Sequence, residues 1–258
     1  MTETDTAPTP LPRLRVGVLL WLAATLGAVT VTVGVLPLLT AKMPLPAPLW
    51  VIMIASFFQS ALLVALAVWG GTALAPAVGL RAPAFEAAAT RRSFVQALRP
   101  QVLPGLIAGL PAGVLLFASL RLSPAPIAAL QVQFNAPLYA RILYGGITEE
   151  VLLRWGLMTA FTWLAWRFFQ RRRGAVKPGL TWLAISASAL LFGAGHLPVA
   201  HYLIGSLNVP VVVFVVGVNA TFGLLFGWLY WRRGLESAMI AHATTHIVNY
   251  LSTQLVPI

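Results

Sequence analysis

The chain has 258 residues, of which 59% are hydrophobic and 9% are charged, and its mean hydropathy is +0.85. This composition excludes an ordinary soluble domain and predicts a protein embedded in a lipid bilayer. The formal net charge is +11, but the basic residues gather between apolar segments, as membrane topology requires, so we expect no nucleic-acid partner. The absence of cysteine excludes thiol catalysis, disulfides and cysteine-ligated metal sites.

Residues 1–15 are predicted to form a disordered cytoplasmic tail, and residues 16–258 a single membrane domain. The first apolar segment is too long for the core of a signal peptide, so we expect it to be retained. Seven segments reach the length of about 20 residues that a helix needs to cross the hydrocarbon core. They cover about residues 16–39, 48–72, 101–121, 137–166, 179–200, 208–231 and 235–255. They lack the alternation of barrel strands, so the predicted fold class is all-α, a polytopic transmembrane helical bundle of about seven spans, six to eight.

Two segments between these spans have their own patterns. Residues 84–100, AFEAAATRRSFVQALRP, mix charged and apolar side chains and predict an amphipathic surface helix. Residues 122–136 are too short to span and are predicted to be a loop or an interfacial piece. With the N-terminus inside, thirteen basic residues are cytoplasmic and only Lys42 and Arg121 are outside. We therefore expect a multi-pass protein of a bacterial inner membrane with a cytoplasmic N-terminus and an external C-terminus.

Ionisable side chains within the predicted spans are candidates for function, because each costs a few kcal/mol at bilayer depth. The fourth span contains Arg141, Glu149, Glu150 and Arg154, the fifth contains His196, and the seventh contains His242 and His246. The only aspartate, Asp5, lies in the tail, which excludes a two-aspartate intramembrane protease. The common serine-hydrolase and zinc-protease motifs, G-x-S-x-G and H-E-x-x-H, are also absent.

The spacing of these residues predicts how they can act together. Glu150 and Arg154 are four apart and can form an ion pair on one helix face, while Glu149 lies about 100° around the helix and can face a cavity. The basic turn RRRGAVKPG, residues 171–179, joins the fourth and fifth spans, and counting from it brings Glu150 and His196 to similar depth. By the same counting, His242 lies only about 12 Å from its own turn. Either the hairpin protrudes or a helix is tilted or broken, and the sequence leaves both open.

Three short motifs, in order on successive apolar spans, carry a resemblance to a known family. EEVLLR (149–154) fits E-E-x-x-x-R, FGAGH (192–196) fits F-x-x-x-H, and HATTH (242–246) falls where the family has H-x-x-x-N or a close variant. With the lead-in over 222–242, they resemble the CPBP family of intramembrane proteases, which is related to type II CAAX prenyl endopeptidases and to bacteriocin-processing and immunity proteins. The likeness covers about residues 130–250, and the first three spans carry no such motif.

The resemblance implies hydrolysis of a peptide bond near a protein or peptide terminus in a membrane cavity. It implies that Glu149 is the general base with His196 beside it, that Glu150 and Arg154 support it, and that His242 stabilises the oxyanion. His246 takes the position usually held by asparagine. Glu149 and the three histidines could hold Zn²⁺, but a glutamate-activated water without metal is also argued for the family, and both remain open.

Other interpretations of the same residues remain. Glu149, Glu150 and Arg154 could be a structural ion-pair group, and the histidines could be packing residues that hydrogen-bond between helices. The chain could then be a non-catalytic immunity or scaffold protein on the same fold, or a small proton-coupled transporter. The complete motif set favours the endopeptidase, and no duplicated half supports a transporter. The expected partners are the lipid bilayer and a peptide or protein substrate within it; the oligomeric state is not predicted.

Overall fold

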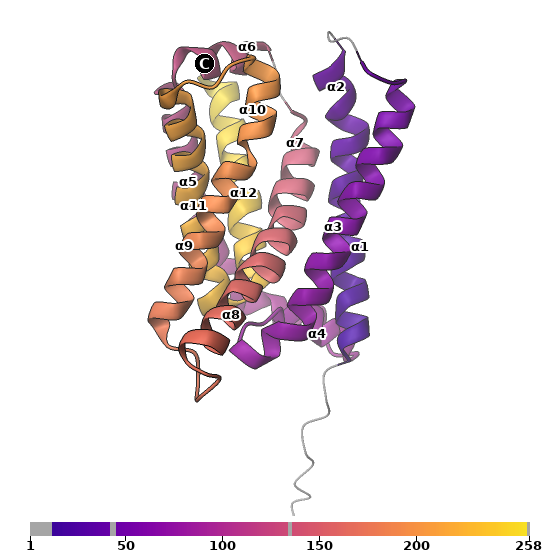
Figure 1. The fold of residues 1–258 in the computed structure, drawn as a ribbon, viewed down its shortest axis with the longest axis vertical. Coiled ribbons are helices and arrows are strands. Elements are labelled where there is room, and N and C mark those ends of the chain that lie inside the picture. Colours follow the sequence, from indigo (N-terminus) through magenta and orange to yellow (C-terminus); the bar gives the residue numbers. More distant parts are fainter. Residues whose placement is uncertain (1–11, 42–44, 134–135, 257–258) are drawn as a thin grey trace, which may run out of the picture.

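The computed structural model describes residues 12–41, 45–133 and 136–256, and all regular structure within these ranges is helical. Long helices run side by side between two ends that carry short helices and turns (Figure 1). The predicted all-α class is therefore confirmed. Most of the predicted disordered tail, residues 1–11, lies outside the described residues, and the first helix begins at Arg13.

The first half of the bundle holds three long helices and three short ones. They are α1 (Arg13–Gly34), α2 (Leu36–Thr40), α3 (Leu49–Val78), α4 (Pro83–Ala89), α5 (Phe94–Arg121) and α6 (Ala125–Gln133). The second half begins with one long helical run whose centre is π-helical, and continues with the remaining helices. They are α7 (Leu138–Ala140), η1 (Arg141–Glu149), η2 (Val151–Met158), α8 (Thr159–Phe169), α9 (Pro178–Gly195), α10 (Leu197–Ile204), α11 (Val209–Arg233) and α12 (Leu235–Leu255).

Five helical segments of the described chain are long and apolar enough to cross a membrane: Arg13–Thr40, α3, α5, Pro178–Ile204 and α11. Large apolar side chains such as Phe58, Leu62 and Leu66 of α3 are exposed on the outside of the bundle, as expected for a surface solvated by lipid. The two other predicted spans correspond to the run from α7 to α8 and to α12, which carry most of the ionisable residues. The chain is a multi-pass membrane protein.

The two ends of the bundle differ in charge. The described chain enters at the lower end of Figure 1, where the α3–α4, α4–α5, α8–α9 and α11–α12 turns lie, and ends at the opposite side. Because the described chain starts and finishes on opposite sides of the bundle, it crosses the bundle an odd number of times, in agreement with the seven predicted spans. The turns and helix ends at this lower end together contain most of the basic residues. Basic residues are therefore unequally distributed between the two ends, which is the feature that the positive-inside rule uses. The assignment of the lower end to the cytoplasm stays a prediction.

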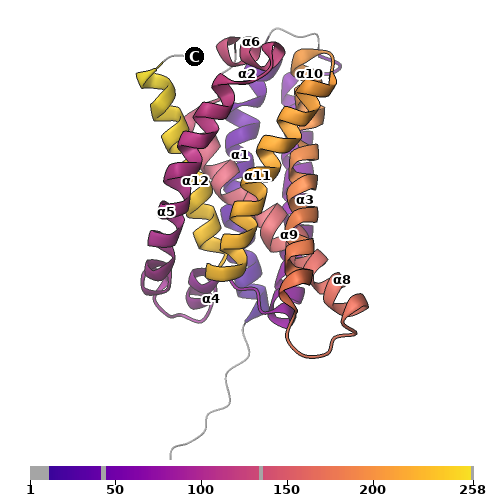
Figure 2. The same ribbon diagram turned by 90° about the vertical axis from the view of Figure 1, so that its left-hand side faces the viewer.

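α12 packs closely against α5 because glycines line the contact. Gly105, Gly109 and Gly113 recur every four residues, and a Cβ at Gly109 would lie 2.6 Å from the carbonyl oxygen of Ala241 and from the Cβ of Thr244. Small residues at this spacing let two helix backbones approach within a membrane. Contacts with α5, η1 and α11 bury most of α12 between Leu235 and Asn249, while its C-terminal end runs to the edge of the bundle (Figure 2).

The predicted surface helix over residues 84–100 is divided into two elements. α4 ends at Ala89, Arg91 has a left-handed backbone with φ 59°, and Ser93 begins α5 by accepting a hydrogen bond from the N–H of Gln96 at 3.2 Å. α4 itself is largely buried, including Glu86, so it closes the end of the bundle. Residues 122–136, predicted to be a loop or interfacial piece, include the short helix α6, while residues 134–135 lie outside the described residues.

Candidate active site

The fourth predicted span is widened at its centre. η1 and η2 have the i→i+5 hydrogen-bond pattern of a π-helix, and Glu150, between them, keeps helical dihedral angles. π-helical turns are rare and occur frequently at functional sites. The widened segment contains both adjacent carboxylates, Glu149 and Glu150.

Glu150 and Arg154 form a buried ion pair, as their spacing predicts. Glu150 is 0% exposed and Arg154 1%, and 3.2 Å separates Oε2 of Glu150 from Nε of Arg154. The guanidinium lies over the rings of Phe192 and Phe226, 5.1 and 5.6 Å from their centroids, and donates to the carbonyl of Gly223 at 3.4 Å. A buried charge needs such partners because an unpaired one is strongly destabilising. Phe192, the first residue of FGAGH, therefore supports Arg154.

His242 lies between the two glutamates. Its Nδ1 is 2.8 Å from Oε1 of Glu150, and its Nε2 is 3.9 Å from Oε2 of Glu149. A carboxylate oxygen only accepts, so we assign the proton to Nδ1, which donates to Glu150. This bond orients the ring and directs Nε2 towards Glu149. Glu150 thus contacts both Arg154 and His242, and the second contact was not among the sequence predictions.

The ring of His242 is enclosed by other rings and by a glycine. It stacks on Phe226 and on His246, with centroid distances of 4.6 and 4.9 Å. Gly145, one turn before Glu149, faces both histidines: a Cβ there would lie 2.7 Å from Nε2 of His246 and 3.3 Å from Nε2 of His242. The lack of a side chain at residue 145 therefore allows both imidazoles to approach the widened helix.

His196 ends α9 and is oriented by its own helix. Its Nδ1 lies 2.8 Å from the carbonyl oxygen of Phe192, and the two rings meet edge to face at 4.8 Å. The carbonyl can only accept, so Nδ1 carries the proton and Nε2 is directed away from the helix. No hydrogen bond or ion pair among the described residues joins His196 to Glu149, but both line the same cavity.

Two cavities meet at the site. One, of about 590 Å³, lies among α1, η1, η2, α9 and α10, and its wall includes Glu149, Tyr144, His196 and His246. The other, of about 340 Å³, lies among α5, α6, α10, α11 and α12. Both are mostly apolar, and both are lined by Arg141, His196 and His246. Glu149 is 16% exposed in its side chain, whereas Glu150 is enclosed and His242 lines neither cavity, so Glu149 is the carboxylate that a substrate can reach.

The depth of His242, left open by the sequence, is explained by the hairpin. Its contact with Glu150 shows that both reach one level of the bundle. Figure 2 shows the α8–α9 turn extending further down than the α11–α12 turn, so the hairpin protrudes. Of the two alternatives, the protruding hairpin is present, and α12 runs as one helix from Leu235 to Leu255.

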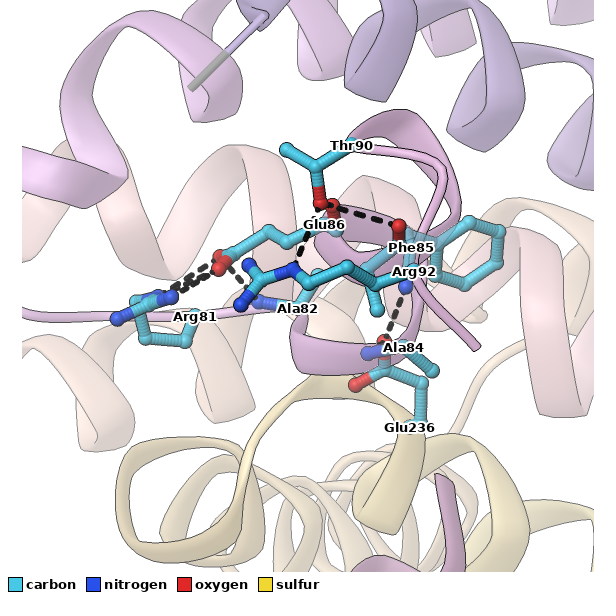
Figure 3. Close-up of polar contacts among 9 residues, drawn as sticks. Arg81, Ala82, Ala84, Phe85, Glu86, Thr90, Arg92 and Glu236 are labelled. Carbon is cyan, nitrogen blue, oxygen red and sulfur yellow. Dashed lines mark hydrogen bonds and ion pairs between the residues drawn. The ribbon is translucent and has the colours of Figure 1, made fainter. Parts of the chain in front are cut away.

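The start of α12 is anchored to α4 and α5. The carboxylate of Glu236, a buried residue, accepts the N–H groups of Ala84 at 2.8 Å and Phe85 at 3.0 Å (Figure 3). Ser237 donates its hydroxyl to the carbonyl of Gln101 at 3.0 Å and its N–H to Oε1 of Gln101 at 3.3 Å. These hydrogen bonds fix both the position of α12 along its axis and its rotation about that axis. His242 follows six residues later, so this anchor sets its position.

A second carboxylate stabilises the segment that receives α12. Glu86 binds the guanidinium of Arg81 and accepts the N–H of Ala82 at 3.0 Å (Figure 3). The hydrogen bond to Glu86 raises the pKa of Arg81 above its ordinary value, so the guanidinium stays charged. The carbonyl of Arg81 in turn accepts the N–H of Leu235 at 3.0 Å. The α3–α4 connection and the start of α12 are therefore one hydrogen-bonded unit.

The proposed zinc ligands do not converge in this arrangement. Within residues 12–41, 45–133 and 136–256, no group of three or more His, Asp or Glu side chains is placed to hold one metal ion. Nδ1 of His242 faces Glu150 and Nδ1 of His196 faces a backbone carbonyl, which leaves one nitrogen on each ring. Since the donor set does not fit zinc, we derive no chemical step through a metal.

Several residues around the site were not singled out from the sequence. Gly145 and Phe226 contact the histidines, and Asn249, 2% exposed, lies one turn beyond His246 and lines the smaller cavity. The i, i+3 spacing of His246 and Asn249 was a usable signal. Two other asparagines make local hydrogen bonds: Asn208 accepts the N–H of Val211 at the start of α11, and Asn219 donates to the carbonyl of Val215.

Comparison with known proteins gave one match. Residues 131–248 match a family model described as type II CAAX prenyl endopeptidase Rce1-like. No curated protein and no solved structure matched the chain. The matched range contains all six predicted catalytic residues and both π-helical segments. Residues 131–248 therefore form a domain of the Rce1-like type II CAAX prenyl endopeptidase family, within the CPBP proteins.

Proposed function

We propose that the chain is an intramembrane endopeptidase that hydrolyses a peptide bond near a terminus of a peptide or protein in the membrane. The observation that carries the proposal is the position of His242 between two carboxylates, at 2.8 Å from Glu150 and 3.9 Å from Glu149. A structural ion pair with Arg154 accounts for the buried charge of Glu150 but not for Glu149. It leaves unexplained a second carboxylate that faces a cavity lined by two histidines.

The gap between Glu149 and His242 suits one oxygen atom. An oxygen can lie about 2.8 Å from both Oε2 of Glu149 and Nε2 of His242 when these atoms are 3.9 Å apart. In the proposed reaction, Glu149 accepts a proton from water at this position, and the hydroxide attacks the scissile carbonyl carbon. The C–N bond then breaks, and the proton held by Glu149 passes to the amine that leaves.

Donors near Glu149 would stabilise the oxyanion that forms. Nε2 of His242 and Nε2 of His196 are the nitrogens that their Nδ1 contacts leave available, and each can donate to the oxyanion once its ring also carries a proton there. Fixed donors in an apolar, water-poor cavity stabilise developing negative charge more strongly than donors in water. The roles of His242 and His246 implied by the resemblance stay predictions, and His246, stacked on His242, contributes at least to the position of that ring.

Comparing protein termini in membranes tests the proposal. Cells that make the wild-type chain, Glu149→Gln or His196→Ala are compared for new termini, with His201→Ala as a matched control because His201 is exposed outside the site. We expect termini that depend on Glu149 and His196 but not on His201. If the phenotype of the chain survives in Glu149→Gln and no terminus depends on it, the protein acts as a binding or scaffold protein instead.

A further inference from the structure

The basic turn between α8 and α9 has a fixed shape. Gln170 donates to the carbonyls of Arg173 and Ala175 at 2.6 and 2.7 Å, and its Oε1 accepts the N–H of Lys177 at 3.1 Å. The indole of Trp166 donates to the carbonyl of Gly174 at 3.0 Å. Side-chain hydrogen bonds thus hold the whole turn, so its charges are presented in a defined arrangement.

Two arginines of this turn occupy backbone positions that favour glycine. Arg171 and Arg172 have φ of 51° and 59°, in the left-handed region, next to Gly174 at 63°. A side chain is unfavourable there, and glycine is the usual residue. Membrane topology needs basic residues near the turn, but it does not need them at these two positions. Arginine is kept at both positions despite this cost, as it is at Arg91 in the α4–α5 turn.

The charge of the turn has no acidic counterpart nearby. The chain from 151 to 235 contains no aspartate or glutamate, and all of it is described. Arg171, Arg172, Arg173 and Lys177 are exposed, and the guanidinium of Arg172 lies 5.7 Å from the ring of Trp166. A cluster of four exposed cations beside an aromatic side chain suits an anionic group at the membrane surface.

An apolar groove begins where this turn ends. It has a volume of about 360 Å³, lies between α8 and α9, and is lined by residues that include Phe161, Leu164, Phe168, Phe169, Leu183 and Ala187. Phe169 immediately precedes the turn, and the other residues continue the groove along both helices. Phe168 and Phe169 are 68% and 75% exposed. The groove therefore leads from the basic turn into the part of the bundle that hydrocarbon surrounds.

We propose that the turn and the groove together bind one anionic phospholipid. The phosphate lies against the cations of residues 171–177, and an acyl chain lies along the α8–α9 groove. The cationic turn suits the phosphate of a lipid, and the apolar groove suits its acyl chain. An acidic soluble partner would contact the cations but leave the groove unfilled. This site is separate from the two cavities that His196 and His246 line, and the proposal does not depend on peptidase activity.

Lipid retention tests this site. The full-length protein is placed in nanodiscs with equal amounts of phosphatidylglycerol and phosphatidylcholine, and the lipids that stay bound after transfer to detergent are measured by mass spectrometry. We expect a preference for phosphatidylglycerol on the order of tenfold or more, because each basic residue near a surface contributes to binding an anionic lipid. Replacing Arg171, Arg172 and Arg173 by glutamine should reduce this preference to about twofold or less.

A matched triple variant and a groove variant complete the test. Arg91→Gln, Arg92→Gln and Arg99→Gln together remove the same charge from the α4–α5 turn and the first turns of α5, at the same end of the bundle, and should keep the preference. Ala187→Phe, which fills the groove, should lower retention of phosphatidylglycerol with all cations intact. No preference in the wild type, equal effects of the two triple variants, or unchanged retention in Ala187→Phe would each overturn the proposal.

Discussion

Oε1 of Glu150 lies 2.8 Å from Nδ1 of His242, although 92 positions separate the two residues in the chain. The same carboxylate is paired with Arg154 through its other oxygen. Glu150 therefore links the widened helix, the buried cation and α12 at one point. Its neighbour Glu149 makes no ion pair with Arg154, lies 3.9 Å from His242 and forms part of a cavity wall. The two adjacent glutamates therefore have different surroundings.

Glu150→Gln and Glu149→Gln are expected to separate stability from activity. Loss of the Glu150 charge leaves Arg154 buried without its counter-ion, and breaking such a pair destabilises a protein by about 3–5 kcal/mol. Glu149→Gln removes a partly exposed carboxylate and should change stability by less than about 0.5 kcal/mol. Thermal unfolding followed by tryptophan fluorescence in detergent measures both. Equal shifts in Tm for the two variants would contradict the division of roles.

Gly145→Ala is expected to impair the site through packing alone. The new Cβ would lie 2.7 Å from Nε2 of His246, so the stacked histidines must move, and overpacking of this kind costs about 1–3 kcal/mol. Gly217→Ala is the matched control, since a Cβ there meets no atom within 4 Å. Activity on the substrate identified by terminus mapping should fall in Gly145→Ala and stay unchanged in Gly217→Ala. A fully active, equally stable Gly145→Ala protein would show that the rings do not depend on this contact.

Glu236→Ala should loosen α12 from α4. It leaves the N–H groups of Ala84 and Phe85 without their acceptor, at about 1–3 kcal/mol for each unsatisfied buried group. Hydrogen–deuterium exchange at these two amides should accelerate, and activity should fall because His242 lies six residues further along α12. Glu236→Gln retains one acceptor oxygen and should be affected less. If exchange and activity are unchanged in Glu236→Ala, the anchor does not set the position of His242.

Metal removal is expected to leave activity intact. The described His and Glu side chains do not converge on one point, so the proposed reaction depends on Glu149 and the histidines alone. Activity of protein purified in metal-free buffer and treated with a strong chelator should match that of untreated protein. Loss of activity on chelation, with recovery on adding Zn²⁺ and no change in Tm, would show that a metal ligand set forms during the reaction.

The sequence predicted the helical class and the Glu150–Arg154 pair because both follow from local periodicity. It left the depth of His242 open, since the protrusion of the α8–α9 hairpin depends on how far α8 and α9 extend beyond the level of α12. The π-helical segments were also missed, because local periodicity carries no signal for them; contacts with distant residues, such as that of the Thr148 hydroxyl with the carbonyl of Ala24, are not visible in the sequence. The break before α5 was within reach, since Ser93 and Gln96 have the spacing of a capping box.

We propose that Glu149 activates water for peptide hydrolysis inside the membrane. Purified wild-type chain and Glu149→Gln, each in nanodiscs, are incubated in ¹⁸O-labelled water with membrane proteins from cells that lack the chain, and new carboxyl termini are identified by mass spectrometry. We expect ¹⁸O-labelled termini with the wild type and none with Glu149→Gln, although both proteins unfold at similar Tm. Labelled termini at equal rates with both proteins, or none with the wild type, would contradict it.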